Sequence, residues 1–205
     1  SRGLGDVYKR QPLRAFLGAT CVEASGDEKL LKVTISGPPG SGTSTLVSRI
    51  SESRGWASLN GGDIFREEAK TRGLTVEQLS SEAKEDLDVD RTLDSLLQKR
   101  MSSHESPEIV ESRLSGWWAH KNDLNCLRVW VNASEEERAR RIQSREGGEL
   151  VECLQKSQKR QKDDMERYLD LYGIDLDDMS PYNLVIDADE KDELQVYQAV
   201  NSELG

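Results

Sequence analysis

The sequence predicts an α/β fold in which helices flank a parallel sheet of five strands. Five short apolar runs, rich in β-branched residues, alternate along the chain with longer polar segments that show helical periodicity. The runs lack the strict alternation of apolar and polar residues that marks a half-exposed strand, so they are typical of strands buried on both faces. Buried strands that alternate with helices form a parallel sheet.

Turn residues set the ends of the predicted strands. The first run stops at Gly37, and Gly61 and Gly62 follow the second run. Glycine directly after an apolar run indicates a strand that leads into a loop. The five predicted strands cover residues 30–36, 56–59, 107–111, 127–132 and 183–187.

Helices are expected in the segments between these strands. The sequence predicts them at residues 43–54, within 63–103, from Ser134 onward, at 149–172 and at 190–203. Thr75 with Gln78 and Ser134 with Glu137 have the spacing of a capping box, and Asp86 or Asp88 has the position of a further N-cap. Two helical segments are too long and too polar for simple crossovers. We therefore expect one domain over 30–205 that carries insertions at about 61–105 and 141–170.

Composition excludes several classes of function. The formal net charge of −10 argues against a general nucleic-acid binder, which would carry a basic surface. The longest apolar runs are about six residues, too short to cross a membrane. Cys21, Cys126 and Cys153 are odd in number and widely spaced, which favours a reducing, cytoplasmic location. Two histidines are too few for a histidine-based metal site.

The first 29 residues are expected to form a disordered leader. Residues 1–11, SRGLGDVYKRQ, have no apolar core and no periodicity, and they resemble a translated sequencing adapter. They are therefore set aside from fold reasoning as artefactual. Residues 12–29 are open to two interpretations, a short native extension or the remnant of a transit-like segment.

A glycine-rich loop follows the first predicted strand and opens a helix. It reads GPPGSGTST and comprises Gly37, Pro38, Pro39, Gly40, Ser41, Gly42, Thr43, Ser44 and Thr45. Such a loop wraps its backbone N–H groups around the phosphates of a nucleotide such as ATP, and the Ser44 hydroxyl has the position that holds Mg²⁺. The alternative, a plain Gly-Pro turn that caps a helix, is disfavoured by the strand before it and the helix after it. The sequence thus predicts a P-loop NTPase fold, although Thr43 stands where the motif has lysine.

Arginines in the second insertion are candidates to supply the missing positive charge. Arg138, Arg141 and Arg145 share one helix face, and Arg160 and Arg167 are two turns apart on another. Converging guanidinium groups stabilise the charge of a transferring phosphoryl group. The alternative is a solvated helix with salt bridges between neighbouring turns, which the phosphate loop upstream makes the weaker interpretation. Four arginines are the catalytic candidates: Arg141, Arg145, Arg160 and Arg167.

The segment after the second strand has the residues of a nucleotide monophosphate pocket. Gly62, Asp63, Phe65 and Arg66 combine backbone space, an aromatic ring and a cation. The alternative is that Asp63 caps a helix and Arg66 is its surface partner. Both interpretations stay open from the sequence.

Two further acid–base pairs complete the candidate site. Glu111 and Arg113 lie at the end of the third strand, where open α/β sheets bind ligands. Glu111 is placed to contact Mg²⁺ through water, and Arg113 to reach an acceptor ligand. Asp90 with Arg91 offers a carboxylate beside a guanidinium, a pair that suits the donor and acceptors of cytosine.

Taken together, these motifs resemble the archaeal-type cytidylate kinases, which are P-loop nucleoside monophosphate kinases. The resemblance runs from about residue 30 to the C-terminus. Its landmarks are VTISGPPGSGTST, GGDIFREEAK, DVDRTLD, IVESRLSGWW, ERARRIQSREG and KRQKDDMERYLDLYGIDLDDMSPYNLVID. In that family Thr43 is a variant within the normal range. Ser112 departs from the usual glycine before Arg113, and Gln161 and Asp163 depart from a common Glu and Ser.

The resemblance implies transfer of the ATP γ-phosphoryl group to CMP or dCMP with Mg²⁺, by a monomer that has a mobile lid. It assigns the glycine loop to the ATP phosphates, Arg66 to the acceptor phosphate and Arg113 to acceptor binding. It places Arg145, Arg160 and Arg167 in the closing lid. Nucleic acid and membrane are not expected partners.

Three alternatives remain beside this interpretation. Another small P-loop kinase, such as an adenylate kinase, would differ in the acceptor base. A regulatory P-loop module that binds nucleotide without useful catalysis would show a conspicuous exposed apolar patch. A catalytically dead relic would have lost its lid arginines, and these are present.

Overall fold

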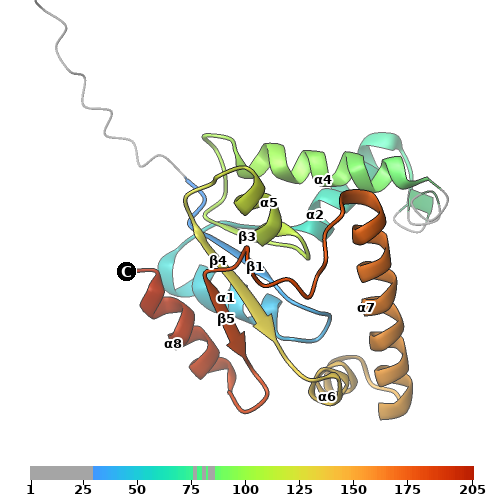
Figure 1. Cartoon of the computed structure of the whole chain (residues 1–205), viewed down its shortest axis with the longest axis vertical. Coiled ribbons are helices and arrows are strands. Elements are labelled where there is room, and N and C mark those ends of the chain that lie inside the picture. Colours follow the sequence, from blue (N-terminus) through green and yellow to red (C-terminus); the bar gives the residue numbers. More distant parts are fainter. Residues whose placement is uncertain (1–29, 76–77, 80–81, 83–85) are drawn as a thin grey trace, which may run out of the picture.

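The computed structural model describes residues 30–75, 78–79, 82 and 86–205, so the expected leader lies outside the described residues. Its centre is one sheet of five strands in the order β2-β3-β1-β4-β5 (Figure 1). All four strand pairings are parallel, as predicted. The strands are β1 Val33–Ser36, β2 Ser58–Asn60, β3 Ile109–Glu111, β4 Leu127–Asn132 and β5 Leu184–Asp187.

The strand order places the start of the glycine loop at the middle of the sheet. After β1 the chain crosses to the edge strand β2, returns to β3 beside β1, and then moves to β4 on the other side of β1. The order of the strands thus reverses at β1. The carboxyl ends of strands at such a reversal leave a crevice in which α/β proteins bind ligands.

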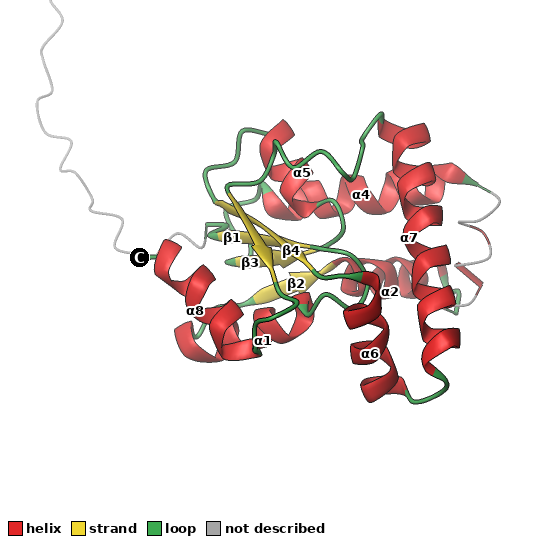
Figure 2. Cartoon of the chain, turned by 60° about the horizontal axis from the view of Figure 1, so that its bottom comes forward, coloured by secondary structure: helices red, strands yellow, loops and turns green. Residues whose placement is uncertain are grey.

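Helices cover both faces of the sheet. They are α1 Thr43–Arg54, α2 Gly61–Arg72, α4 Leu87–Met101, α5 Ser115–Lys121, α6 Glu135–Glu146, α7 Leu150–Tyr172 and α8 Glu193–Glu203. Figure 2 shows α1 and α8 on one side of the sheet and α4 and α5 on the other, with α6 and α7 forming a hairpin beside it. Among the described residues, no helix combines the length and the apolar content needed to cross a membrane.

Two hydrophobic cores hold these layers together. On one face, α1 supplies Leu46 and Ile50, and α8 supplies Val200, against buried residues of β1 and β4. On the other face, Trp118 of α5 and Leu97 of α4 pack into the second core. Because one core lies on each face of the sheet, the central strands β1, β3 and β4 are largely buried on both faces, which explains why they have no polar side. The edge strands β2 and β5 are partly exposed.

Local sequence signals account for most of the helix starts. Thr75 and Gln78 form the reciprocal hydrogen bonds of a capping box, and Asp86 caps α4. Ser134 caps α6 by accepting from the Glu137 N–H, but the predicted box is incomplete. The Glu137 carboxylate pairs with arginines one turn further on instead of returning to Ser134.

The structure differs from the prediction mainly at element ends. β1, β2, β3 and β5 begin one to three residues later than the predicted strands, whereas α1 and β4 have the predicted bounds. The short helix α5 had no predicted counterpart. Its sequence, SGWWAHK, is too short to show a helical period, and the buried Trp118 fixes it by packing.

Candidate active site

A cavity of about 930 Å³ opens at the carboxyl ends of β1 and β3. The glycine loop, the start of α2, one face of α4, the segment after β3 and the α6–α7 hairpin line it. Its size is in the range of small-ligand sites in proteins. Five segments that are separate in the sequence therefore meet around one space.

The glycine loop has a backbone that ordinary residues adopt only with strain. Gly40 has φ 84° and Gly42 has φ 100°, both in the left-handed region. A Cβ at Gly40 would also lie 2.9 Å from the carbonyl oxygen of Arg138, so the space behind the loop is filled by α6. These glycines allow the tight turn that leads from β1 into α1.

Arginines hold three carbonyl groups of this loop. Arg113 donates to the carbonyl oxygen of Gly37, and Arg138 donates to that of Pro39 at 3.4 Å. Arg141 donates to the carbonyl oxygen of Ser41 at 2.8 Å. The engaged carbonyls belong to alternate residues of the loop, so guanidinium groups fix its outer side from β3 and α6.

Arg138 and Arg141 therefore have structural partners. Arg138 is 2% exposed, and burial lowers its pKa. The guanidinium of Arg141 also donates to Glu137 at 2.9 Å and to the carbonyl oxygen of Ala188 at 2.6 Å. Arg141, one of the four catalytic candidates, lines a second cavity of about 520 Å³, together with Arg145, the second half of the glycine loop and the start of α1. Arg141 lines this cavity because it lies in the second turn of α6, directly behind the glycine loop.

Other residues of the predicted ATP site divide between the two cavities. Gly37, Pro38 and Pro39 line the first cavity, and Ser41, Gly42 and Thr45 line the second. Gly40, Thr43 and Ser44 line both cavities, because the loop passes between them.

Ser44 and Glu111, the predicted metal-binding pair, are in contact. The Ser44 hydroxyl donates to Oε1 of Glu111 at 2.9 Å, which joins the start of α1 to the end of β3. A hydroxyl and a carboxylate are ligands that suit Mg²⁺. No group of three or more His, Cys, Asp or Glu side chains in the described part of the chain could hold a metal alone. The donor set thus fits a cation that takes its remaining ligands from phosphate and water.

The predicted acceptor segment forms the first turn of α2. Gly62, Phe65 and Arg66 line the first cavity. Asp63 completes a capping box with Asn60 and accepts from Arg66 at 2.5 Å. The structure thus gives Asp63 the capping position that was the alternative interpretation, and it does not place Asp63 in the cavity lining.

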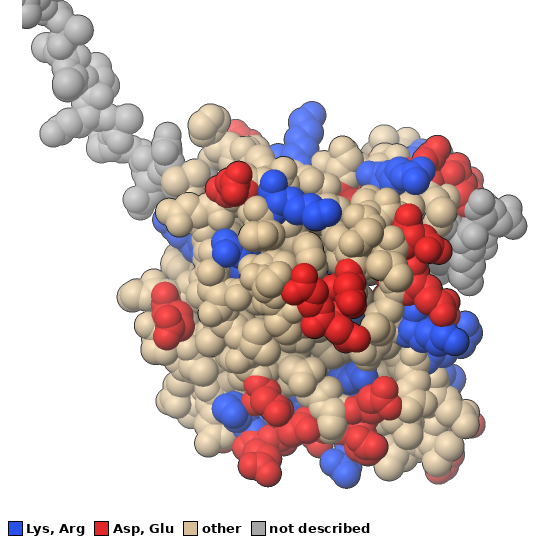
Figure 3. Space-filling view, in the orientation of Figure 1, with Lys and Arg blue, Asp and Glu red and all other residues tan. Residues whose placement is uncertain are grey.

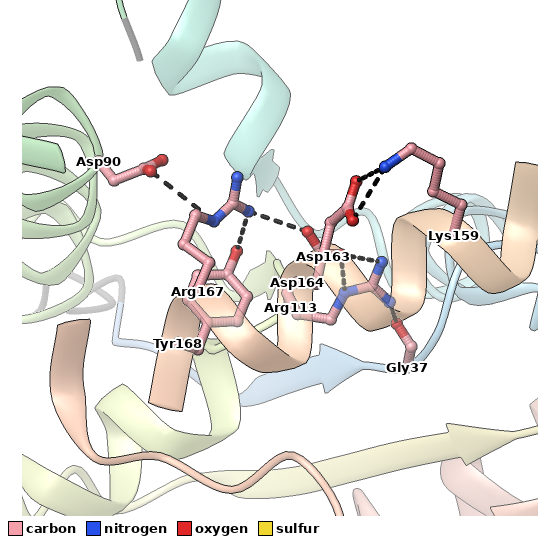
Figure 4. Close-up of polar contacts among 8 residues, drawn as sticks. All are labelled: Gly37, Asp90, Arg113, Lys159, Asp163, Asp164, Arg167 and Tyr168. Atoms are coloured by element: carbon pink, nitrogen blue, oxygen red, sulfur yellow. Dashed lines mark hydrogen bonds and ion pairs between the residues drawn. The ribbon is translucent and has the colours of Figure 1, made fainter. Parts of the chain in front are cut away.

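An ion-pair network connects α7 to the loop and to α4 (Figure 4). Asp164 accepts from Arg113 at 2.9 Å and from Arg167 at 2.9 Å. Arg167 also lies 3.7 Å from Asp90 and donates to the hydroxyl of Tyr168 at 3.2 Å. Burial raises the pKa of Asp90, and the charge of Arg167 opposes that shift. Two arginines that were predicted to bind phosphate thus share one carboxylate in this structure.

The other lid candidates are less constrained. Arg145 and Arg160 both line the first cavity. Arg145 pairs with its neighbour Glu146, and both side chains are exposed. Within the described residues, the structure records no hydrogen bond or ion pair for Arg160. Its guanidinium is therefore available to an anion in the cavity.

Two cavity residues were missed from the sequence. Asp164 has the spacing of a helical ion pair with Arg167, but acidic residues are too common in this chain for that spacing to single it out. Asp94 lies one turn after Asp90 on α4 and lines the same cavity. Burial raises the pKa of Asp94 to about 6, while a hydrogen bond from Tyr172 opposes the shift. The i, i+4 spacing of Asp90 and Asp94 in DVDRTLD was the available signal.

Two sequence details are clarified by the geometry. Arg91, which was paired with Asp90 from the sequence, instead donates to Asp88 at 2.7 Å and is absent from the described cavity lining. Ser112 adopts an ordinary backbone, because Asp123 is the one non-glycine residue with positive φ in the described part of the chain. Serine at position 112 therefore introduces no backbone strain.

Acidic and basic side chains are mixed both on the surface and in the cavity. On the face drawn in Figure 3, acidic groups are interspersed with basic ones over the described residues. Five carboxylates and Lys156 line the cavity together with five arginines, in a protein of net charge −10: Arg66, Arg113, Arg145, Arg160 and Arg167. Such a concentration of guanidinium groups is suited to phosphate-bearing ligands.

Known proteins with similar sequences include several kinases. A family model described as an AAA domain matches residues 36–168. The cytidylate kinase of Archaeoglobus fulgidus is 40% identical over 158 residues, covering 77% of this chain and 86% of that protein. The cytidylate kinase of Methanopyrus kandleri is 34% identical over 177 residues, covering 83% and 91% respectively.

Solved structures support the fold. A shikimate kinase from Bacteroides thetaiotaomicron has a TM-score of 0.55 at 16% identity, covering 84% of this chain and 96% of that one. A gluconokinase from Sinorhizobium meliloti gives 0.55 at 16% identity, covering 86% and 93%. These likenesses confirm the predicted sheet with its flanking helices. Because sequence identities of 34–40% extend over most of the chain, the protein belongs to the archaeal-type cytidylate kinases.

Proposed function

We propose that this cavity transfers the γ-phosphoryl group of ATP to CMP or dCMP, giving ADP and CDP or dCDP. One observation carries the proposal: the glycine loop, the Ser44–Glu111 pair and five arginines line the same cavity. The family to which the chain belongs supports cytidine monophosphate as the acceptor.

The donor phosphates are expected on the glycine loop. The loop ends at the first turn of α1, whose free N–H groups and helix dipole favour an anion. Arg113, Arg138 and Arg141 hold loop carbonyls and so keep the loop in shape before nucleotide arrives. A preformed loop binds phosphate without the cost of ordering it first.

Magnesium is proposed to bind beside Ser44 and Glu111. When bound, Mg²⁺ would neutralise part of the charge of the phosphates. The Ser44 hydroxyl would contact the ion directly, and Glu111 would hold it directly or through water. The 2.9 Å hydrogen bond between the two side chains orients them for this purpose.

The acceptor phosphate is expected between α2 and α7, with Arg66 and Arg113 as ligands. Asp164 holds Arg113 and Arg167 together in this structure. An acceptor phosphate that enters between these guanidinium groups competes with the carboxylate for them. Charge-assisted hydrogen bonds to phosphate are strong enough for that exchange, and bidentate arginine contacts fix the orientation of the phosphate.

The chemical step needs position and charge neutralisation, and no general base. An oxygen of the acceptor phosphate forms a bond to the γ-phosphorus, and the bond from the γ-phosphorus to the β–γ bridging oxygen breaks. The attacking oxygen carries no proton when the phosphate is fully ionised. Arg145, Arg160 and Arg167 are proposed to stabilise the charge on the transferring group. We infer that the α6–α7 hairpin moves as a lid and that the protein acts as a monomer.

A panel of acceptors tests this proposal. ADP formation is measured with Mg²⁺ and ATP against CMP, dCMP, UMP, AMP and GMP. We expect kcat/KM for CMP or dCMP to exceed that for AMP and GMP by at least about 10²-fold, since a site that hydrogen-bonds one base leaves groups unpaired with another. Equal rates with all acceptors would contradict the assignment. A reaction without acceptor measures any background ATP hydrolysis.

A further inference from the structure

Asp94 lies at the end of the cavity that faces α2 and α4. That end has apolar and aromatic walls, formed by Ile64, Phe65, Leu93, Leu97 and Tyr168. The glycine loop belongs to another segment of the lining, and Arg160 lies two turns before Tyr168 on α7. A nucleotide whose phosphate lies among the arginines would extend its base between these apolar walls, where flat rings pack favourably.

The two carboxylates at this end differ in their partners. Asp90 pairs with Arg167 at 3.7 Å and is thus part of the phosphate-binding network. Oδ2 of Asp94 accepts from the Tyr172 hydroxyl at 2.7 Å. Oδ1 of Asp94 accepts no bond of hydrogen-bond geometry from the described residues. The indole N–H of Trp118 lies near this carboxylate and lowers its pKa, but it makes no bond of hydrogen-bond geometry. Oδ2 of Asp94 is thus held by Tyr172, and Oδ1 is left for a ligand.

Aromatic packing holds this carboxylate in place. The ring of Tyr172 meets that of Trp118 edge to face, with centroids 5.0 Å apart, and Trp118 is buried. Tyr168, one turn earlier on α7, has its ring nearly parallel to that of Tyr172, with centroids 6.4 Å apart. The hydroxyl that binds Asp94 is thus fixed by the end of α7 and by α5. A rigid acceptor discriminates between ligands better than a mobile one.

Cytosine and uracil differ in the group that such an oxygen would meet. Cytosine carries an amino donor on C4, whereas uracil carries a carbonyl acceptor there. An ionised carboxylate only accepts hydrogen bonds. It therefore pairs with the amino group of cytosine and repels the O4 atom of uracil. A site with an unmatched polar group rejects the wrong ligand strongly, because the group stays buried and unpaired.

We propose that Asp94 is the residue that distinguishes cytosine from uracil in the acceptor nucleotide, with its Oδ1 accepting from the C4 amino group. This inference rests on the proposed function of the same cavity, since it concerns the acceptor of that reaction. Tyr172 is a positioning residue that holds the carboxylate through Oδ2. Asp90 serves Arg167 and does not read the base.

The charge of Asp94 gives the selectivity a pH dependence. Burial raises the pKa of Asp94 to about 6, Asp90 adds to the shift, and Tyr172, Trp118 and Arg167 oppose it. Above this pKa the carboxylate is charged and favours cytosine. As pH falls through it, the carboxyl gains a proton, becomes able to donate to uracil O4, and loses its preference.

The test compares CMP with UMP in the wild type, Asp94→Asn, Tyr172→Phe and Asp88→Asn. The ratio of kcat/KM for CMP to that for UMP is measured, together with the binding of each nucleotide by calorimetry without ATP. Asparagine keeps the shape but offers both a donor and an acceptor. We expect the ratio to fall at least about tenfold in Asp94→Asn, the scale of one base contact, and to fall less in Tyr172→Phe. Asp88 is exposed on the same helix, so Asp88→Asn keeps the ratio of the wild type.

A pH series in the wild type makes the test independent of how well the variants fold. The ratio is followed between about pH 8 and about pH 5.5, a window that brackets the pKa of about 6. Taking the ratio cancels the ionisation of the nucleotide phosphate, which both acceptors share. The ratio should decrease toward low pH in the wild type and stay constant in Asp94→Asn.

The outcomes separate the two proposals. A wild type that phosphorylates no CMP contradicts the proposed function. A wild type that prefers CMP, with an Asp94→Asn protein that keeps both the preference and the stability of the wild type, overturns the role of Asp94 alone. A ratio that falls toward low pH equally in the wild type and in Asp94→Asn also overturns it.

Discussion

Thr43, the first residue of α1, carries no charge, so other elements must neutralise the phosphates of a bound nucleotide. Arg145, Arg160 and Arg167 line the cavity from the α6–α7 hairpin. Of these, Arg160 has no recorded partner among the described residues, whereas Arg167 is shared with Asp164 and Asp90. Neutralisation of the phosphates therefore depends on arginines from a distant part of the chain. Among these, Arg160 can bind an anion without first giving up a protein partner.

Arg160→Ala tests that dependence. We expect kcat to fall roughly 10³-fold, the lower end of the effect of an arginine that stabilises a phosphoryl-transfer transition state. The melting temperature should stay close to that of the wild type, since the side chain is exposed and makes no recorded contact. Steady-state kinetics and thermal unfolding measure the two effects.

Lys159→Ala is the matched control for this variant. Lys159 precedes Arg160 on α7, is 77% exposed and pairs with Asp163 outside the cavity lining. Its removal should leave kcat unchanged. Near-normal turnover in Arg160→Ala would show that charge neutralisation does not come from this residue.

Residue types at the site were predictable where a motif has a fixed spacing. The glycine loop, Ser44 with Glu111, and the lid arginines follow from strand-loop-helix context and from helical periodicity. The partners of those residues were not predictable. Asp164 is 51 residues from Arg113 and three residues from Arg167 in the sequence. Only the folded structure brings Asp164 and Arg113 together. The carbonyl partners of Arg141 were not predictable for the same reason, because its helix position does not reveal which carbonyl groups lie beneath it.

At the scale of elements, apolar runs predicted every strand, because a strand buried on both faces has a plain sequence signal. Strand ends were less certain, since pairing in a parallel sheet depends on the neighbouring strand. Helix α5 was missed because seven residues show too little periodicity, and its position depends on Trp118 in the core. The segment between α2 and α4 lies partly outside the described residues.

Contact between α6 and the glycine loop leads to a prediction for Arg141→Ala. The change removes donors to the carbonyl groups of Ser41 and Ala188, at 2.8 Å and 2.6 Å. Losing hydrogen bonds of this kind costs about 1–2 kcal/mol, which corresponds to a rise in KM for ATP of roughly five- to thirtyfold. KM for CMP should change little, since Arg141 does not line the acceptor cavity.

Arg140→Ala controls for the ion pair with Glu137. Arg140 and Arg141 both pair with that carboxylate, but the structure records no bond from Arg140 to the loop. Kinetics with varied ATP should therefore match the wild type in Arg140→Ala. Equal KM values for ATP in the two variants would contradict a loop-bracing role for Arg141.

At the scale of the whole molecule, one carboxylate connects the hairpin to the rest of the protein. Asp164 of α7 holds Arg113, which in turn holds the carbonyl of Gly37 in the loop. Through Arg167 it is also joined to Asp90 of α4 (Figure 4). The α6–α7 hairpin, the glycine loop and α4 thus share one ion-pair network, and a ligand phosphate that competes for the arginines would change all three contacts.

Asp164→Asn should loosen the hairpin without affecting the far side of the sheet. Asp164 is 9% exposed, and the change leaves two guanidinium groups without their common counter-charge, which is costly for buried ion pairs. We expect faster amide hydrogen exchange in α7 and in the loop, with unchanged exchange in α8, which packs on the opposite core. Asp163→Asn, one residue earlier on the exposed side of α7, should exchange like the wild type. If α7 exchanges equally slowly in Asp164→Asn, the hairpin is held by apolar packing and the network does not control its position.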